Sequence, residues 1–201
     1  MGGWPLRLQE SLRATTSTSY LEVVNHAFRF TLSTDILEFL PGDIERFKRP
    51  KDRVSAKHGQ LFGIFQFASD SGFQKGTNQE YIAPKQFKEN IRTIGAYCLK
   101  QLSGPPLLVT MPPLIDTLVN VNQTNGYNHA GRAEYNQYCR DVAKEEGYLL
   151  ADAEQAFLHA MEGQDPANFF FTDGFHPNPL GHILIKDTVL PVAAQMLKDY
   201  P

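Results

Sequence analysis

Short apolar runs that alternate with longer amphipathic stretches are the feature that most limits how this chain can fold. Each run is rich in β-branched or aromatic residues and has the length of a buried strand. Alternation of such runs with helical stretches is typical of βα units stacked into a parallel sheet. The runs are 20–24 (YLEVV), 61–67 (LFGIFQF), 107–110 (LLVT) and 148–151 (YLLA).

The amphipathic stretches predict helices between and after these runs. The clearest has apolar residues at steps of four, three and four, which places them on one helical face. A second is expected to stop at a Glu-Glu-Gly sequence, and the last to start with an Asn N-cap followed by Pro. The residues that mark these helices are Pro84, Phe87, Ile91, Ile94 and Cys98; Tyr135, Tyr138, Cys139, Val142 and Glu145-Glu146-Gly147; and Asn178, Pro179 and a kink at Pro191.

Length and composition favour one globular domain over residues 1–201, with 42% hydrophobic and 20% charged residues. A net charge of −3 offers no cationic surface for nucleic acid or anionic lipid, so we expect neither as a partner. Neither a leader-like N-terminus nor an apolar stretch of membrane-spanning length is evident, which predicts a cytoplasmic protein. Cys98 and Cys139 are expected to be reduced thiols in the core.

The sequence that carries chemistry is 172–177 (TDGFHP), followed by 178–182 (NPLGH). A histidine that acts as a general base needs a partner that fixes its tautomer and supports its protonated form. Asp173, three residues before His176 across a turn that contains Gly174, is placed to do this. We therefore expect Asp173 and His176 to form an acid–base pair.

In its wider context this segment resembles the last conserved block of the SGNH (GDSL-type) ester hydrolases, in particular the branch that hydrolyses isoamyl acetate. Three further segments resemble that branch in order and spacing, and together they extend the resemblance over nearly the whole chain. They are 2–4 (GGW), 24–28 (VNHAF) and 109–113 (VTMPP). The resemblance implies a flavodoxin-like α/β/α fold, hydrolysis of small acyl esters, no cofactor, and catalytic roles for His176 and Asp173.

The chain departs from the family pattern at the other catalytic positions. Phe30 stands where the resemblance implies a glycine of the oxyanion hole, and Ser69 stands where it implies an asparagine. The Gly-Asp-Ser block with its nucleophilic serine is missing, so the domain is interpreted as truncated at its N-terminus and lacking the first, central strand. Two functions stay open: an ester hydrolase that is inactive or impaired as written, and a non-catalytic relative that binds a small acyl ligand or a protein.

Ser71 is the other candidate for the nucleophile. Ser71, in the sequence 69–72 (SDSG), follows an apolar run, but reading it as the nucleophile leaves the two preceding βα units without a place in the sheet. A polar loop after the strand is the preferred interpretation. The histidines and cysteines show no metal-ligand spacing, so we expect no metal.

The missing strand has a consequence for the sheet. In the flavodoxin-like order it would lie between the runs 20–24 and 61–67, and an empty position would leave unpaired amides along both neighbours. We expect the two runs to close up and pair directly in a four-stranded sheet. Occupation of the gap by another segment or by a second copy, through self-association, is the alternative.

Overall fold

The structure, a computed structural model, describes residues 3–16, 21–27, 30–47, 60–73, 79–122, 126–127 and 129–199. Helices and strands alternate along the chain from the first strand on, as predicted. In chain order the elements are α1 (Trp4–Thr15), α2 (Ser33–Phe47), β1 (Ile64–Gln66), α3 (Pro84–Gln101), β2 (Leu107–Val109), α4 (Asp116–Asn122), α5 (His129–Glu146), β3 (Leu149–Ala151), α6 (Ala153–Ala160), a short 3-10 helix (Pro166–Asn168) and α7 (Pro179–Asp199).

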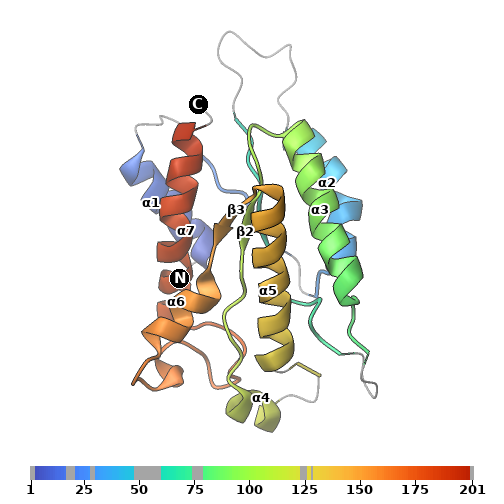
Figure 1. The fold of residues 1–201 in the computed structure, drawn as a ribbon. Helices are drawn as coiled ribbons and strands as arrows, with labels where there is room; N and C mark the ends of the chain where they lie inside the picture. Colours follow the sequence, from blue (N-terminus) through green and yellow to red (C-terminus); the bar gives the residue numbers. More distant parts are fainter. Residues whose placement is uncertain are drawn as a thin grey trace.

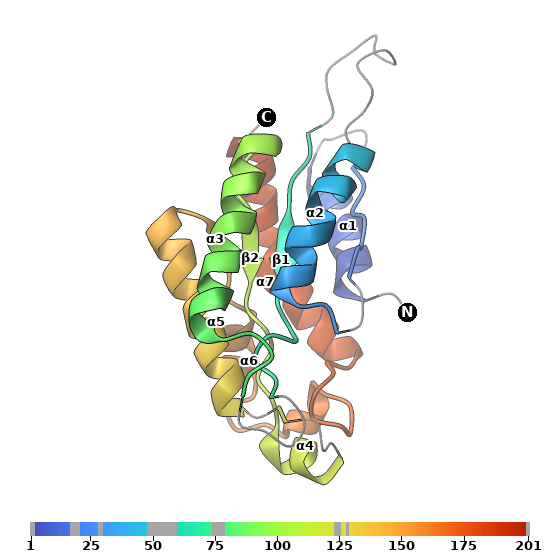
Figure 2. The same ribbon diagram turned by 90° about the vertical axis from the view of Figure 1, so that its right-hand side faces the viewer.

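The three strands form a small parallel sheet in the order β1-β2-β3, with helices on both of its faces. Helices α1 and α7 pack together on one face, while α2 packs on α3 and α3 on α5 over the other, as Figures 1 and 2 show. A parallel sheet needs crossover helices that cover it, and each strand here is linked to the next through such a helix. The α/β fold with a parallel sheet is therefore as predicted.

The central strand, β2, shows how the sequence builds both halves of the core. Leu107 and Val109 belong to the cluster under α1, α6 and α7, whereas Leu108 belongs to the cluster under α3 and α5. Successive side chains of a strand point to opposite faces, so a run that is apolar at every position is buried on both sides. All three residues are at most 1% exposed.

The prediction for the first apolar run is wrong. Residues 21–24 form no strand, and in the described part of the chain no fourth strand pairs with β1. The backbone of this segment is instead bonded to α1, because the Val23 amide donates to Gln9 Oε1 at 2.8 Å and Arg13 Nε donates to the Leu21 carbonyl at 2.8 Å. Direct closure of the two runs is thus overturned. The alternative, that another segment or a second copy occupies the position beside β1, stays open. Tyr20 lies outside the described residues.

The predicted helix signals were placed correctly. α3 begins at Pro84, and α5 ends at Glu146 before Gly147, which has φ +70°. Asn178 caps α7, since its Oδ1 accepts from the amides of Leu180 at 2.9 Å and Gly181 at 3.2 Å. A left-handed glycine at a helix end and an Asn N-cap both satisfy backbone groups that would otherwise lack a partner.

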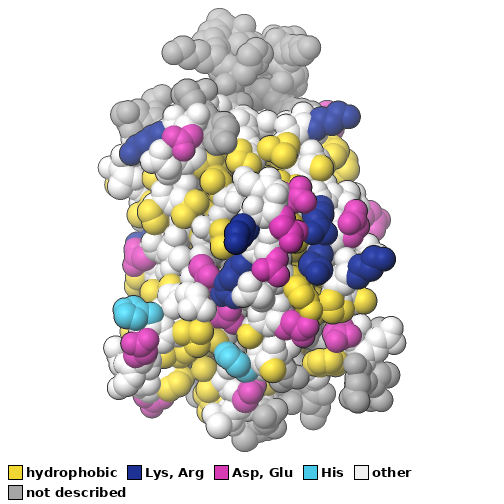
Figure 3. Space-filling view, viewed as in Figure 1, with side chains coloured by type: hydrophobic (Ala, Val, Ile, Leu, Met, Phe, Trp, Pro, Cys, Tyr) yellow, Lys and Arg dark blue, Asp and Glu magenta, His cyan; other side chains and the backbone are white. Residues whose placement is uncertain are grey.

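Opposite charges are interspersed on the surface of α3 and α5 rather than gathered by sign. Figure 3 shows Lys and Arg side chains next to Asp and Glu on the face toward the viewer. Arg92 of α3 pairs with Glu145 and Glu146 of α5, at 2.5 and 3.0 Å. Across the described ranges, helices that are both long enough and apolar enough to traverse a bilayer are lacking.

Candidate functional site

The loops that follow the strands meet at the carboxyl-terminal end of the sheet, which lies at the lower end of Figures 1 and 2 beside α4. The chain segment that precedes α7 and carries His176 lies at the same end. Ile115, after β2, donates its amide to the Gly174 carbonyl at 3.0 Å, which joins two of these segments. In open α/β sheets the carboxyl ends of the strands form the ligand-binding edge.

Asp173 and His176 form the predicted pair. His176 Nδ1 lies 2.7 Å from Asp173 Oδ2, and the other carboxylate oxygen accepts the amides of Phe175 and His176, each at 2.9 Å. Partial burial alone would raise the pKa of Asp173, but these hydrogen bonds lower it below its ordinary value. A charged carboxylate on Nδ1 selects the tautomer with the proton on Nδ1, which leaves Nε2 as an acceptor. The imidazole is 64% exposed and open to a ligand.

The turn between the two residues needs its glycine. Gly174 has φ +63°, and a Cβ at this position would lie 2.6 Å from Leu118 Cβ and 2.9 Å from the Ile115 carbonyl oxygen. A side chain would therefore both strain the backbone and push the loop away from α4. The loop is also held from the other side, because the Phe171 amide donates to the His176 carbonyl at 2.9 Å.

Ser69 lies in the turn after β1 and lines a cavity of about 260 Å³. The other walls of this cavity are the side chains of Phe30, Leu32, Tyr81 and Tyr127. Ser69 is 8% exposed and its side chain is hydrogen-bonded to the Tyr127 hydroxyl. Of the groups that line the cavity, these two hydroxyls are the buried polar ones.

Ring contacts connect this cavity to the acid–base pair. The Tyr127 ring packs edge-on against Phe175, with 5.1 Å between centroids, and Phe175 packs against the His176 ring at 4.9 Å. Ser69 and His176 therefore lie at the same edge of the sheet, as expected from their positions after strands. From the sequence, Tyr127 is most simply a core or groove-wall residue, and the structure places it in the wall of this cavity.

Phe30 adopts a backbone conformation that side chains rarely take. Its φ is 59°, in the left-handed region. This is the position at which the family resemblance implies a glycine. The ring is 57% exposed and lies in the wall of the Ser69 cavity. A non-glycine residue at positive φ is strained by about 1 to 2 kcal/mol, and such strain is found preferentially at functional positions.

A buried arginine that the sequence did not mark supports the same loops. Arg132 of α5 is 1% exposed, and its guanidinium carbon lies 4.5 Å from the Phe175 ring centroid and 6.0 Å from that of Tyr127. Its nitrogens reach the carbonyls of Pro112 and Ala68 at 3.4 and 3.5 Å, whereas Nε finds no hydrogen-bond partner among the residues that the structure describes. Burial lowers the pKa of this guanidinium to about 10, so it stays charged at neutral pH.

The alternative nucleophile, Ser71, lies in the turn after β1 and is 5% exposed. In the described part of the chain no hydrogen bond connects it to His176, whose ring bonds to Asp173. The two cysteines are free and buried, as predicted, and burial raises the pKa of Cys98 to about 12. A thiol with so high a pKa is a poor nucleophile.

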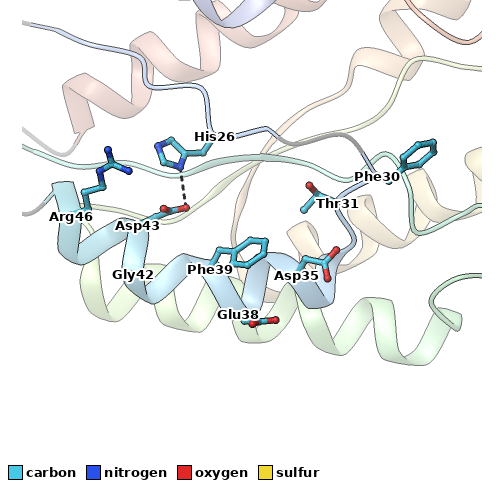
Figure 4. A pocket seen from close by; sticks show the side chains of 9 residues that line it. All are labelled: His26, Phe30, Thr31, Asp35, Glu38, Phe39, Gly42, Asp43 and Arg46. Atoms are coloured by element: carbon cyan, nitrogen blue, oxygen red, sulfur yellow. Dashed lines mark ion pairs between the residues drawn. The ribbon is translucent and has the colours of Figure 1, made fainter.

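A second, larger hollow of about 610 Å³ lies along α2, and its walls include neither Asp173 nor His176. Figure 4 shows His26 paired with Asp43 at one end of it and Phe30 at the other. The His26 Nδ1 to Asp43 Oδ2 distance is 3.2 Å, and both side chains are about one-third exposed. Acidic groups of α2, Asp35 and Glu38, line it between these ends, so it differs in character from the neutral cavity at Ser69. Among the described residues, groups of three or more metal-ligating side chains are not found.

Several solved structures share this fold at low sequence identity. An α/β hydrolase from the metagenome of Lake Arreo matches with a TM-score of 0.73 and 21% identity, over 96% of this chain and 81% of its own. A lipase/acylhydrolase of Enterococcus faecalis has a TM-score of 0.69 and 16% identity, over 94% and 83%. Axe2, an acetylxylan esterase of Geobacillus stearothermophilus, has a TM-score of 0.72 and 15% identity, over 94% and 80%.

At these identities the likeness shows the fold alone. No curated protein sequence matches the chain significantly. The profile of the GDSL-like lipase/acylhydrolase family, however, matches residues 2–184, which is most of the sequence and includes the Asp173–His176 segment. The chain therefore belongs to the GDSL-like lipase/acylhydrolase family.

Proposed function

We propose that this chain binds small acyl esters at the edge that carries His176, and that it hydrolyses them slowly or not at all. The observation that carries the proposal is the 2.7 Å contact between His176 Nδ1 and Asp173 Oδ2. A histidine held in this way is prepared to take a proton at Nε2 from an attacking group and to return it to a leaving alcohol. The neutral cavity beside Ser69 would take the acyl group.

The size of the cavity supports a short acyl chain. At about 260 Å³ it lies just below the range of 300 to 1,000 Å³ that is typical of sites for drug-sized ligands. Apolar walls with two buried hydroxyls suit an uncharged carbonyl compound better than an anion, whose burial needs a charged partner. The resemblance to the branch that hydrolyses isoamyl acetate supports the same class of substrate.

Impaired turnover is proposed because the acid–base pair lacks a partner to activate. Within the described residues, neither a hydroxyl nor a thiol is hydrogen-bonded to His176. Without an activated nucleophile the imidazole can only act on water. Phe30 and Ser69 add to this, since loss of one well-aimed oxyanion donor costs about 2.7 to 4 kcal/mol in a serine protease. A non-catalytic acyl-binding protein is thus the second candidate function.

The test is hydrolysis of 4-nitrophenyl acetate by the purified chain and by His176→Ala and Asp173→Asn. We expect all three to react at rates that agree within about twofold, because the pair has no nucleophile to activate. Binding of 2-pentanone, a ketone with the shape of ethyl acetate that cannot be hydrolysed, is expected to persist in the unmodified chain.

One result would overturn impaired turnover: a rate that falls on His176→Ala and is blocked by an organophosphate that labels Ser71. Loss of the same rate in Ser71→Ala, with Ser11→Ala on α1 as the control, would then make Ser71 the nucleophile of an active hydrolase. Absence of 2-pentanone binding to the unmodified chain would refute the acyl-binding site itself.

A further inference from the structure

The cavity beside Ser69 contains a hydroxyl that the family resemblance does not assign. Tyr127 is 7% exposed, lines the cavity, and is hydrogen-bonded to the Ser69 side chain. A serine hydroxyl is short, and a substrate oxygen beyond its reach would need a longer donor. The side chain of Tyr127 is longer, and it lines the same cavity as Ser69.

The Tyr127 ring is built into this position from three sides. A Cβ at Gly72 would lie 2.6 Å from the ring atoms Cε1 and Cζ of Tyr127, so only glycine lets the β1 turn approach the ring. The preceding residue is fixed as well, since the Phe73 amide donates to the Gly126 carbonyl at 3.0 Å. Phe175 and the Arg132 guanidinium carbon pack on the ring, with centroid distances of 5.1 and 6.0 Å. A side chain held so firmly presents its hydroxyl in one place.

The direction of the Ser69–Tyr127 hydrogen bond decides what the phenol can offer. Burial raises the pKa of the Tyr127 hydroxyl, while the Ser69 hydrogen bond and the charge of Arg132 act to lower it. Ser69 can donate to the Tyr127 oxygen, and a hydrogen bond in this direction leaves the proton of the phenol free for another acceptor. Because its pKa is raised rather than lowered, the phenol is protonated at neutral pH and can donate a hydrogen bond.

We propose that Tyr127 binds the carbonyl oxygen of the acyl ligand, as the donor that takes over where Ser69 is too short. This inference rests on the acyl-binding function proposed above. Ser69 orients the phenol by donating to its oxygen, and Phe175 ties the same ring to the loop of His176. Arg132 is a positioning residue: its buried charge lies behind Tyr127 and Phe175 and holds both rings. The ligand class is an uncharged short-chain ester.

The role of Tyr127 is tested by titrating the complete chain and its Tyr127→Phe variant with 2-pentanone and monitoring binding by heteronuclear NMR. The variant keeps the ring and its contacts with Gly72, Phe175 and Arg132 and removes only the hydroxyl. We expect the dissociation constant to rise about fivefold, which corresponds to one neutral hydrogen bond. Tyr97→Phe is the matched control, because Tyr97 of α3 is not among the residues that line either cavity, and we expect a change of less than about twofold.

The infrared carbonyl band of bound 2-pentanone gives a second measurement that a purely structural role would not move. A hydrogen bond to the carbonyl lowers its stretching frequency, so the bound band should be red-shifted in the unmodified chain and in Tyr97→Phe, and unshifted in Tyr127→Phe. An unchanged dissociation constant and a retained red shift in Tyr127→Phe would overturn the proposal while leaving the acyl site in place. No binding to the unmodified chain would instead refute the acyl site, and this inference with it.

Discussion

Phe30 offers a test of the backbone on which the Ser69 cavity depends. We compare Phe30→Gly with Phe30→Ala. Both variants remove the ring, which is 57% exposed, so the free energy lost with its partial burial is the same in both and cancels in the comparison. At φ 59° an alanine keeps the left-handed strain of about 1 to 2 kcal/mol, and a glycine does not. Glycine in turn loses about 0.5 to 1 kcal/mol more in conformational entropy on folding. Phe30→Gly should therefore be the more stable variant by about 0.5 to 1 kcal/mol.

Urea denaturation measures this difference as a shift in midpoint at equal m-value. The matched control is Phe39 on α2, which is similarly exposed, at 47%, but helical. There the ordinary order applies, and Phe39→Ala should be more stable than Phe39→Gly by about 1 kcal/mol. The sign of the alanine-glycine difference should thus reverse between the two positions. Alanine more stable than glycine at both would refute a positive φ at Phe30 and the strain inferred from it.

Three further predictions concern stability and use the same assay. Gly174→Ala should destabilise the chain by about 2 to 5 kcal/mol, the sum of left-handed strain and of contacts that are too close to α4; an unchanged midpoint would contradict the geometry of the His176 loop. Asp152→Asn should cost about 2 kcal/mol at pH 7, because Asp152 accepts from Arg140 at 2.7 and 2.9 Å and both side chains are mostly buried. Burial alone would raise the pKa of Asp152, but Arg140 holds it below its ordinary value of 3.8, so this difference should be complete above about pH 4 and shrink as the pH falls through the lowered pKa; a difference that grows in acid would contradict the sign. Gly95→Ala should destabilise by about 1 to 2 kcal/mol despite the better helix propensity of alanine, because its Cβ would lie 2.1 Å from Tyr148 Cζ; a stabilised variant would show that the Tyr148 ring moves aside freely.

Local signals in the sequence were sufficient for much of the fold. The runs 61–67, 107–110 and 148–151 each contain a strand, because residues that are apolar on both faces can be buried only inside a covered parallel sheet. The run 20–24 satisfied the same composition rule but forms no strand. Its backbone found partners in Gln9 and Arg13, side chains of another element that no local pattern can reveal.

The candidate site divides in the same way. Asp173 and His176 could be paired from sequence because only Gly174 and Phe175 lie between them, and the short glycine turn keeps them close whatever surrounds them. Phe30 and Ser69 were located by resemblance, and their neighbourhood came from the structure. Tyr127 and Arg132 could not be predicted to reach them, since each comes from a segment more than 50 residues away from Ser69 in the sequence.

By itself, then, the sequence determined what is local: the alternation of strands and helices, the start of α3, the end of α5, the N-cap of α7, and the contact between Asp173 and His176 across Gly174. Only the tertiary structure decided which segments meet at the carboxyl end of the sheet, and that β1 has no further strand beside it among the described residues. It also decided that buried Tyr127 and Arg132 pack near the loops of Ser69 and His176. The reason is physical. Hydrogen-bonded turns and helix caps join residues a few positions apart, whereas the packing of rings and a buried cation depends on the simultaneous placement of elements from distant parts of the chain.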